Sequence, residues 1–223
     1  AGSFIDILYK ELDKNKILLN TSVEKIDLQK KEAILSNGNV VEYEYLVNTS
    51  PLNKFLGLIG GYDDLINEMS YNKVLVFNLG FDRPSKLCTK EHWLYVAGKN
   101  YNFYRCGFYN NILGRKNLSM YIEIGYDKSS VITQTEIDKQ LKLTLDSLKN
   151  LGIIDENTKL VDHMALIMDP AYVHINTKTN QKLDELKAHF SDNNVYTIGR
   201  YGAWIYNSME DSMLKAKELA EKI

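Results

Sequence analysis

The chain has 223 residues, of which 44% are hydrophobic and 25% charged, and its formal net charge is -2. Such a chain can bury a core in one large domain or two intimate ones, and its balanced charge gives no electrostatic reason to expect nucleic acid as a partner. No apolar run approaches the about 20 residues that cross a bilayer, so we expect no membrane span. The two cysteines, Cys88 and Cys106, imply no disulfide framework, and we expect a cytoplasmic protein.

The first quarter of the chain predicts one helix followed by short strands. Apolar residues at helical spacing predict a helix over residues 3–13. The apolar run 17–19 predicts a buried parallel strand, and residues 22–43 predict a β-meander whose two-residue turn is Asn37-Gly38. Residues 45–47 predict another short strand. Because the sequence starts at once with a helix and not with methionine, we expect a fragment of a longer protein.

The middle of the chain predicts a short helical stretch and then an antiparallel sheet. Pro51 follows a polar turn and opens one or two short helices over residues 52–69. A block rich in aromatic and β-branched residues follows, with strands expected at 73–81, 93–96, 103–108 and 118–125. Their alternation predicts a sheet with one covered face.

The last third of the chain alternates between helices and strands. Thr133 and Glu136 have capping-box spacing and open a helix that runs to about residue 151. Beyond it we expect a strand at 160–167, a helix around 183–190, a strand at 195–198 and a final helix capped by Ser208. The whole pattern predicts a mixed α/β (α+β) fold. We expect one domain from residues 1–55 and 195–223 and a second, with the antiparallel sheet and helices, from 56–194.

The segment that leads into the final helix has the residue types of an anion site. A strand runs into Gly199 and Arg200, an aromatic-rich loop follows, and the last helix then begins near Ser208. Free N–H groups at a helix start and a neighbouring guanidinium suit a phosphate or an electron-rich ring edge. An ordinary strand-turn-helix with one surface arginine explains the pattern equally well, so both interpretations stay open.

A second group of candidate binding residues lies in the strand-rich block. Trp93 and Tyr95 share one face of their strand, and Arg105 follows on the next. Such a face can stack a base and hold a diphosphate, although packing of an aromatic face under a helix is the commoner outcome. Tyr172 closes a later strand and could donate its hydroxyl, or could simply pack. We find no Cys/His cluster with metal-ligand spacing, no P-loop and no G-x-G-x-x-G.

Together these segments resemble the UDP-galactopyranose mutase family. The likeness is carried by Trp-Leu-Tyr at 93–95, Phe-Tyr-Arg at 103–105 and Gly-Arg-Tyr-Gly-Ala-Trp-Ile-Tyr at 199–206. Residues 2–12, 21–27 and 43–52 resemble segments that the family shares with the wider amine oxidase and protoporphyrinogen oxidase group of flavoproteins. The likeness covers nearly the whole chain.

This resemblance implies part of an FAD-binding Rossmann-like domain, interleaved with an antiparallel β-sheet substrate domain with covering helices. Residues 1–55 and 195–223 would be the remnant of the FAD domain, and residues 56–194 the substrate domain. Arg200, with Gly199, would contact the FAD pyrophosphate. The last helix, opening at Ser208, Met209 and Glu210, would point its N-terminus at the flavin pyrimidine edge. Val23 would meet the adenosine side through its backbone.

The resemblance also implies a UDP-sugar as substrate. Arg105, Tyr172 and Tyr206 would hold its diphosphate, and Trp93 and Tyr95 would line the sugar-nucleotide site. In the family the reduced flavin attacks the anomeric carbon through N5 and expels UDP, and the sugar recloses as a furanose. No side chain is then the nucleophile. The resemblance therefore implies a role in cell-surface polysaccharide (LPS) biosynthesis.

Two departures from the family pattern limit what the resemblance implies. The dinucleotide-binding loop is missing from this sequence, so we expect the isolated chain to be inactive and not to retain FAD. Ala171-Tyr172-Val173 replaces the family's Gly-Tyr-Pro, which leaves the exact sugar open. An FAD oxidoreductase of the amine oxidase or protoporphyrinogen oxidase type is the alternative enzyme, and a stand-alone binding domain is the third hypothesis. Homo-oligomer formation stays open.

Overall fold

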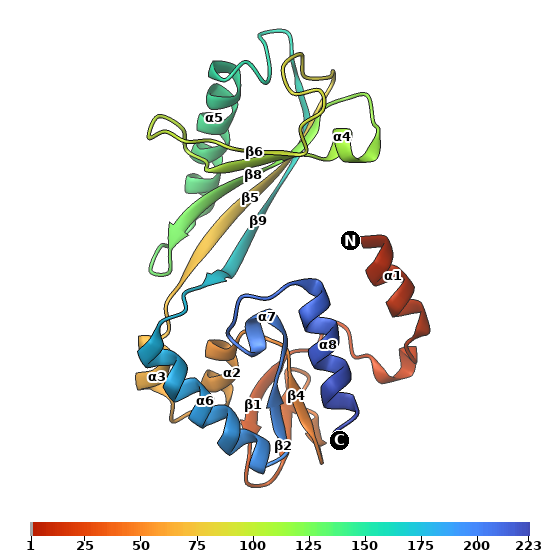
Figure 1. Cartoon of the computed structure of the whole chain (residues 1–223), viewed down its shortest axis with the longest axis vertical. Helices are drawn as coiled ribbons and strands as arrows, with labels where there is room; N and C mark the ends of the chain where they lie inside the picture. The colour runs from red at the N-terminus through yellow and green to blue at the C-terminus, as the bar shows by residue number, and fades with distance from the viewer. Residues whose placement is uncertain (1) are drawn as a thin grey trace. The chain divides into compact units, whose positions relative to one another are not determined.

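The computed structural model describes residues 2–223, which form two compact units (Figure 1). The terminal unit contains the described residues up to Asn67 together with Gln181–Ala203 and Ser208–Ile223. The central unit contains Glu68–Asn180 and Trp204–Asn207. None of the helices in the described part of the chain is both long and apolar enough to span a membrane.

The terminal unit combines two small sheets with helices. Its three-stranded antiparallel sheet has the order β1-β2-β3, and its two-stranded parallel sheet pairs β4 with β10. The strands are β1 Val23–Asp27, β2 Glu32–Leu35, β3 Val40–Glu42, β4 Leu46–Asn48 and β10 Val195–Thr197. The helices are α1 Gly2–Glu11, the 3-10 turn η1 Lys14–Lys16, α2 Leu52–Ile59, α3 Asp63–Glu68, α6 Thr177–Asp192, α7 Gly199–Gly202 and α8 Met209–Ala220.

The two units do not divide at residues 55 and 195, the expected domain boundaries. The reason is that helices α2, α3 and α6 belong mainly to the terminal unit. Phe55 and Tyr62 both meet the ring of Phe190 on α6 edge-on, at centroid distances of 6.0 and 6.1 Å. Phe55 and Phe190 are buried. These aromatic contacts agree with the place of α2, most of α3 and most of α6 in the terminal unit. The binding role of each unit stays a prediction.

Two local predictions in the terminal unit need correction. Residues 17–19 form no strand, and Leu18 and Leu19 are 62% and 68% exposed. A short apolar run without alternation does not distinguish a strand from other structure, and strand formation needs a hydrogen-bonded neighbour. The turn at Asn37-Gly38 is correctly placed but has three loop residues, because Leu35 N donates to Asn39 O and Gly38 N to Leu35 O. Gly38 has φ +82°, as the left-handed position of such a loop requires.

The central unit is a five-stranded antiparallel sheet of order β6-β7-β8-β5-β9. Its strands are β5 Tyr71–Phe81, β6 Trp93–Tyr95, β7 Arg105–Phe108, β8 Ser119–Asp127 and β9 Leu160–Val173, and its helices are α4 Tyr109–Leu113 and α5 Gln134–Asn150. Helix α5 lies along one face of the sheet in Figure 1, and its apolar residues pack against the buried core. The predicted strands and the single covered face are confirmed.

Strand alternation divides the sheet residues between this covered face and the opposite, open face. On β5 the buried residues Leu75, Phe77 and Leu79 lie on the covered face, so Val76 and Asn78 lie on the open one. Because paired residues share a face, one open-face row runs across the sheet as Tyr95, Arg105, Glu123, Val76 and Leu166. The next row is Trp93, Gly107, Tyr121, Asn78 and Met164.

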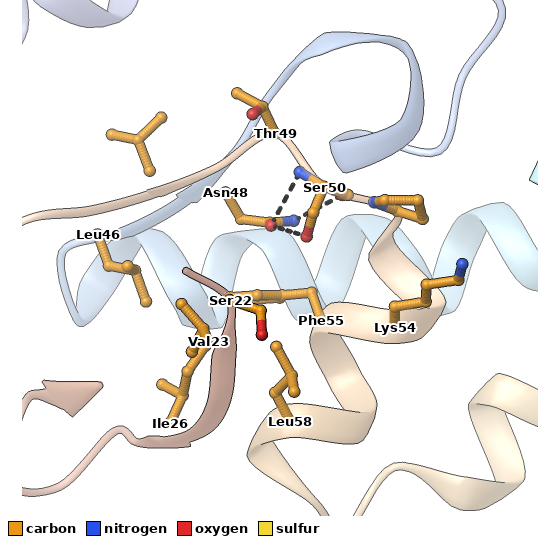
Figure 2. Close-up of a pocket in the computed structure, with 12 residues that line it drawn as sticks. Ser22, Val23, Ile26, Leu46, Asn48, Thr49, Ser50, Lys54, Phe55 and Leu58 are labelled. Atoms are coloured by element: carbon orange, nitrogen blue, oxygen red, sulfur yellow. Dashed lines mark hydrogen bonds between the residues drawn. The ribbon is translucent and has the colours of Figure 1, made fainter. Parts of the chain in front are cut away.

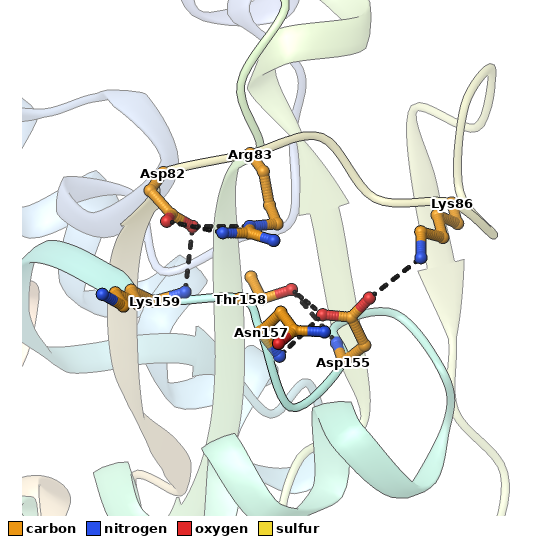
Figure 3. Close-up of polar contacts among 7 residues, drawn as sticks. All are labelled: Asp82, Arg83, Lys86, Asp155, Asn157, Thr158 and Lys159. Carbon is orange, nitrogen blue, oxygen red and sulfur yellow. Dashed lines mark hydrogen bonds and ion pairs between the residues drawn. The ribbon is translucent and has the colours of Figure 1, made fainter.

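Short polar contacts fix the ends of the central sheet. Figure 3 shows Asp82 accepting hydrogen bonds from the backbone N–H of Lys159 at 2.9 Å and from Arg83 Nε at 3.1 Å. In the loop before β9, Asp155 accepts from Asn157 N at 3.0 Å and meets Lys86 Nζ at 3.2 Å. At the start of α5, Thr133 accepts from Glu136 N as predicted. The Glu136 carboxylate itself accepts from Tyr126 and Gln140.

Candidate functional site

The terminal unit contains a cavity of about 550 Å³ beside Val23, here called the Val23 pocket (Figure 2). Apolar side chains form much of its wall and small polar residues follow along one segment of the chain. Its lining residues are Ser22, Val23, Ile26, Leu46, Val47, Asn48, Thr49, Ser50, Pro51, Lys54, Phe55 and Leu58. An apolar wall with a few polar groups is the usual composition of a small-molecule binding site.

Backbone turns shape this pocket. Asn48 ends β4 and is 6% exposed, and its Oδ1 accepts from Ser50 N at 3.1 Å while its Nδ2 donates to Ser50 O at 3.0 Å. This side chain holds the turn between β4 and Pro51, where α2 begins. On the opposite wall, Val23 lies on β1, an edge strand of its sheet, at a pairing irregularity between Val23 and Lys25. The backbone of an edge strand keeps peptide groups that no neighbouring strand uses.

The structure next to this pocket fits part of a flavin dinucleotide. Strands β4 and β10 are parallel and end together at Asn48 and Thr197, and ligands of open α/β sheets bind beyond such carboxyl ends. Thr197 Oγ1 is buried and has no hydrogen-bond partner among the described residues. Gly199 has φ +76°, and a Cβ on Gly202 would come within 2.6 Å of Asn48 O. The chain after β10 therefore approaches the Asn48 turn as only glycine allows.

The predicted cofactor residues after β10 lie on two helices of the terminal unit. Gly199 and Arg200 lie in α7, a short helix that the sequence did not reveal, and Arg200 is half-buried. Ser208 caps α8 as predicted and does so through a capping box: its Oγ accepts from Asp211 N at 3.1 Å, and its N–H donates to Asp211 Oδ2 at 2.8 Å. The backbone N–H of Ser208 thereby lowers the pKa of Asp211. Ser208 and the next two residues, Met209 and Glu210, are exposed. Their contact with a flavin stays a prediction.

On the open face of the central sheet, Arg105 joins two of the predicted substrate residues. Its Nη2 lies 3.2 Å from the Tyr172 hydroxyl, and its Nη1 lies 3.5 Å from the Tyr95 hydroxyl. Arg105 Nε is buried and has no hydrogen-bond partner among the described residues. The guanidinium and the two phenols therefore form one polar group that could bind the oxygen atoms of an anion.

Glu123 is a fourth member of this group, and the sequence reasoning missed it. It lies opposite Arg105 on β8, is 8% exposed, and its Oε1 is 2.5 Å from Arg105 Nη2. Its Oε2 accepts from the Tyr104 hydroxyl. A signal was present: Glu123 lies between Ile122 and Ile124, and an acidic residue between two core-facing positions must point to the open face. Tyr95, Tyr104, Arg105, Glu123 and Tyr172 are called the Arg105 cluster below.

The electrostatics of the Arg105 cluster keep its charges fixed. Burial by itself would lower the pKa of Arg105, but the hydrogen bonds to Glu123 and Tyr95 outweigh burial and raise it above the usual value. Burial and the hydrogen bond to Glu123 raise the pKa of Tyr104. Arg105 is therefore cationic and Tyr104 neutral throughout the physiological range. The pair links β7 to β8 across the open face of the sheet.

Trp93 and Tyr206, the other two predicted substrate residues, are not members of the Arg105 cluster. Trp93 lies on the same face of β6 as Tyr95 and is 57% exposed. Its neighbour across the sheet is Gly107, where a Cβ would come within 2.1 Å of the Tyr121 ring, so that ring lies over the glycine. Tyr206 is 70% exposed and lies on Trp204–Asn207, a segment held in the central unit by edge-on packing of buried Trp204 on Tyr71.

Comparison with known proteins identifies the fold. The sequence model of the family described as flavin containing amine oxidoreductase matches residues 1–223. A solved structure of reduced UDP-galactopyranose mutase is similar, with 20% identity, a TM-score of 0.80, and coverage of 90% of this chain and 46% of that one. A protein assigned as a protoporphyrinogen oxidase from Exiguobacterium sp. 255-15 has 13% identity and a TM-score of 0.76, covering 99% and 50%.

A fatty acid isomerase from P. acnes that produces CLA is also similar, with 14% identity and a TM-score of 0.62, covering 92% of this chain and 47% of that one. No curated protein sequence matches the chain. The chain thus spans about half the length of the solved structures that it resembles. At these identities the likeness establishes the fold, in agreement with the predicted mixed helices and sheets of an FAD-binding fold.

Proposed function

The chain belongs to the flavin containing amine oxidoreductase family, and on that premise we propose that it is part of a longer FAD-dependent enzyme resembling UDP-galactopyranose mutase. The family implies a flavin cofactor and a flavoenzyme of the oxidoreductase type. The finer proposal is that the enzyme interconverts pyranose and furanose forms of a UDP-sugar for cell-surface polysaccharide synthesis. The terminal unit would hold the cofactor and the central unit the substrate.

The Arg105 cluster is the observation that supports a diphosphate substrate. Its guanidinium is held between the Tyr95 and Tyr172 hydroxyls, at 3.5 and 3.2 Å, on an open sheet face. The guanidinium can donate charge-assisted hydrogen bonds to phosphate oxygens through Nη1, and the phenols can donate further ones. One cation with two phenol donors beside it suits a diphosphate better than an amine or a simple alkane chain.

The residues of this chain would then act in binding and charge stabilisation. When bound, the flavin supplies the nucleophilic and redox chemistry. Val23 and the Asn48 turn would hold the adenosine part of the cofactor in the pocket of about 550 Å³. Arg105 would bind the diphosphate and stabilise the negative charge that develops as the sugar–oxygen bond breaks. Trp93, which is half-exposed on the same face, would offer its ring to the nucleoside or sugar.

A second candidate function, an FAD oxidoreductase with an uncharged substrate, is favoured by Glu123. Its carboxylate lies 2.5 Å from Arg105 and brings the formal charge of the cluster to zero. A neutral cluster does not require an anionic substrate. The similarity to the protein assigned as a protoporphyrinogen oxidase is consistent with this alternative.

Titration of the full-length protein with UDP separates the two functions. The mutase-like proposal expects wild-type protein to bind UDP, and Arg105→Lys to weaken binding about 10- to 100-fold, because a single ammonium cannot hold Glu123 and also keep a charge-assisted contact to the diphosphate worth about 1.5–3 kcal/mol. Flavin content should not change, and the loss should shrink at high salt.

Arg83→Lys is the matched control for that titration. Arg83 is also paired with a carboxylate of the central unit, Asp82, but at the end of the sheet. We expect its UDP affinity to equal that of wild type. Calorimetry on the three proteins side by side decides the matter: no UDP binding by wild type, or equal binding by Arg105→Lys, would favour the oxidoreductase.

A further inference from the structure

Glu123 is the only charged residue among the buried polar residues of the described chain, where the others are amides and hydroxyls. A carboxylate is rarely buried unless it is paired, because it loses its hydration in the interior. Glu123 is paired twice, to Arg105 through Oε1 and to the Tyr104 hydroxyl through Oε2. It therefore holds Arg105, the first residue of the neighbouring strand β7, and Tyr104 directly before it.

This double pairing leaves the atoms of Arg105 in unlike situations. Nη2 is occupied by Glu123 and also lies 3.2 Å from the Tyr172 hydroxyl. Among the described residues, Nη1 has only the long 3.5 Å contact with the Tyr95 hydroxyl, and Tyr95 is 68% exposed. Because one side of the guanidinium is fixed by Glu123, the other side keeps a constant direction toward the exposed phenol. A free arginine would lose rotamer freedom on binding a ligand, and this one has lost it already.

We propose that Glu123 is a positioning residue of the anion site: it holds the Arg105 guanidinium in a fixed orientation in which Nη1 and the Tyr95 hydroxyl meet a diphosphate oxygen. This inference rests on the proposed function and extends it by one residue. It assigns no contact between Glu123 and the ligand. The negative charge of Glu123 opposes an anion, so the benefit of orientation must exceed the cost of repulsion.

That balance gives a test in which the two physical effects have opposite signs. Glu123→Gln removes the negative charge and keeps the shape of the side chain. If charge alone mattered, UDP would bind more tightly. If orientation dominates, UDP should bind about tenfold more weakly, as expected when one charge-assisted hydrogen bond is lost. Calorimetric titration of the full-length protein with UDP measures the sign directly.

Glu136→Gln is the matched control for charge. Glu136 also accepts a hydrogen bond from a tyrosine of β8, Tyr126, at 3.1 Å, but on the covered face beside α5. Its substitution removes the same charge from the same unit and should leave the Kd for UDP unchanged. Equal or tighter UDP binding by Glu123→Gln would overturn the proposal. Failure of wild type to bind UDP would instead overturn the proposed function, so the two failures are distinguishable.

Two further measurements separate positioning from general support of the fold. Uridine has no diphosphate, so its affinity should not change in Glu123→Gln; an equal loss for uridine and UDP would contradict positioning. In an Arg105→Lys background, the Glu123→Gln effect on UDP should shrink to less than about twofold, because a residue that acts through Arg105 cannot act without it. Fully additive losses would also contradict the proposal.

Tyr104→Phe covers the case in which Glu123→Gln does not fold. It removes the hydroxyl that holds Glu123 Oε2 and leaves both charges of the pair in place. A carboxylate held by one partner instead of two restrains Arg105 less, so we expect UDP binding to weaken about two- to fivefold. An unchanged Kd for UDP in this variant would overturn the positioning role.

Discussion

The Arg105 cluster and the Val23 pocket are built in opposite ways. The cluster is made of long side chains from four strands that hold one another by charge and hydrogen bonds. The pocket is shaped by turns of the backbone, by a buried asparagine and by glycines. We therefore expect the cluster to tolerate backbone changes nearby but not changes of functional group, and the pocket to respond most strongly to an added Cβ.

The largest expected effect is that of a substitution at Gly202, which packs against the Asn48 turn of the Val23 pocket. Gly202→Ala places a Cβ within 2.6 Å of Asn48 O, and a main-chain oxygen cannot move aside as a flexible side chain can. We expect the free energy of unfolding to fall by about 3 kcal/mol, at the upper end of typical overpacking costs. Chemical denaturation measures it. Gly57→Ala is the control, since it lies inside α2 with nothing within 4 Å of its Cβ position; helix propensity predicts a gain of up to about 1 kcal/mol.

Arg200→Ala examines whether the terminal unit also uses a side chain for the cofactor. If Arg200 contacts the FAD pyrophosphate, removal of a charge-assisted donor should cost about 1.5–3 kcal/mol of FAD binding. Flavin occupancy of purified full-length protein at limiting FAD should fall, with UDP affinity of the reloaded protein less affected. Unchanged occupancy would leave FAD binding to the backbone elements alone and would sharpen the contrast between the two sites.

The smallest expected effect comes from a second Glu–Tyr pair, on the covered face of the same sheet. Burial, and then the hydrogen bond to Glu136, raises the pKa of Tyr126 to about 12. The folded state favours the neutral phenol, so this contribution to stability is fully present below pH 10 and is lost as the pH rises through about 12. Tyr126→Phe should therefore make the fall in stability between pH 10 and 12 less steep. Thermal unfolding across that range measures the slope, and an identical slope in the variant would contradict the shift.

Local sequence rules predicted those elements whose cause is itself local. The hairpin at Asn37-Gly38 formed where predicted because only glycine readily takes φ +82° there. The cap at Ser208 formed because its capping partner Asp211 is three residues away. The covered face of the central sheet followed from alternation along β5 and β8.

Other features depend on partners distant in the sequence. Residues 17–19 are as apolar as a buried strand, yet no neighbouring strand pairs with them among the described residues. Glu123 lies opposite Arg105 because of the register in which β7 pairs with β8. That register depends on tertiary packing and cannot be read from either strand alone. The long strand β9 brings Tyr172 to the same guanidinium from 67 residues away. The resemblance supplied Arg105 and Tyr172 but gave no reason to single out Glu123.

The ring of Tyr121 over Gly107 has a consequence for how this sheet can vary among related sequences. The two residues are direct neighbours on β8 and β7, and a Cβ at 107 would occupy the space that the phenol now fills. One position can therefore gain volume only when the other loses it. We expect relatives with a larger residue at position 107 to carry a small one at position 121. The two positions should then change together although neither residue bears a charge.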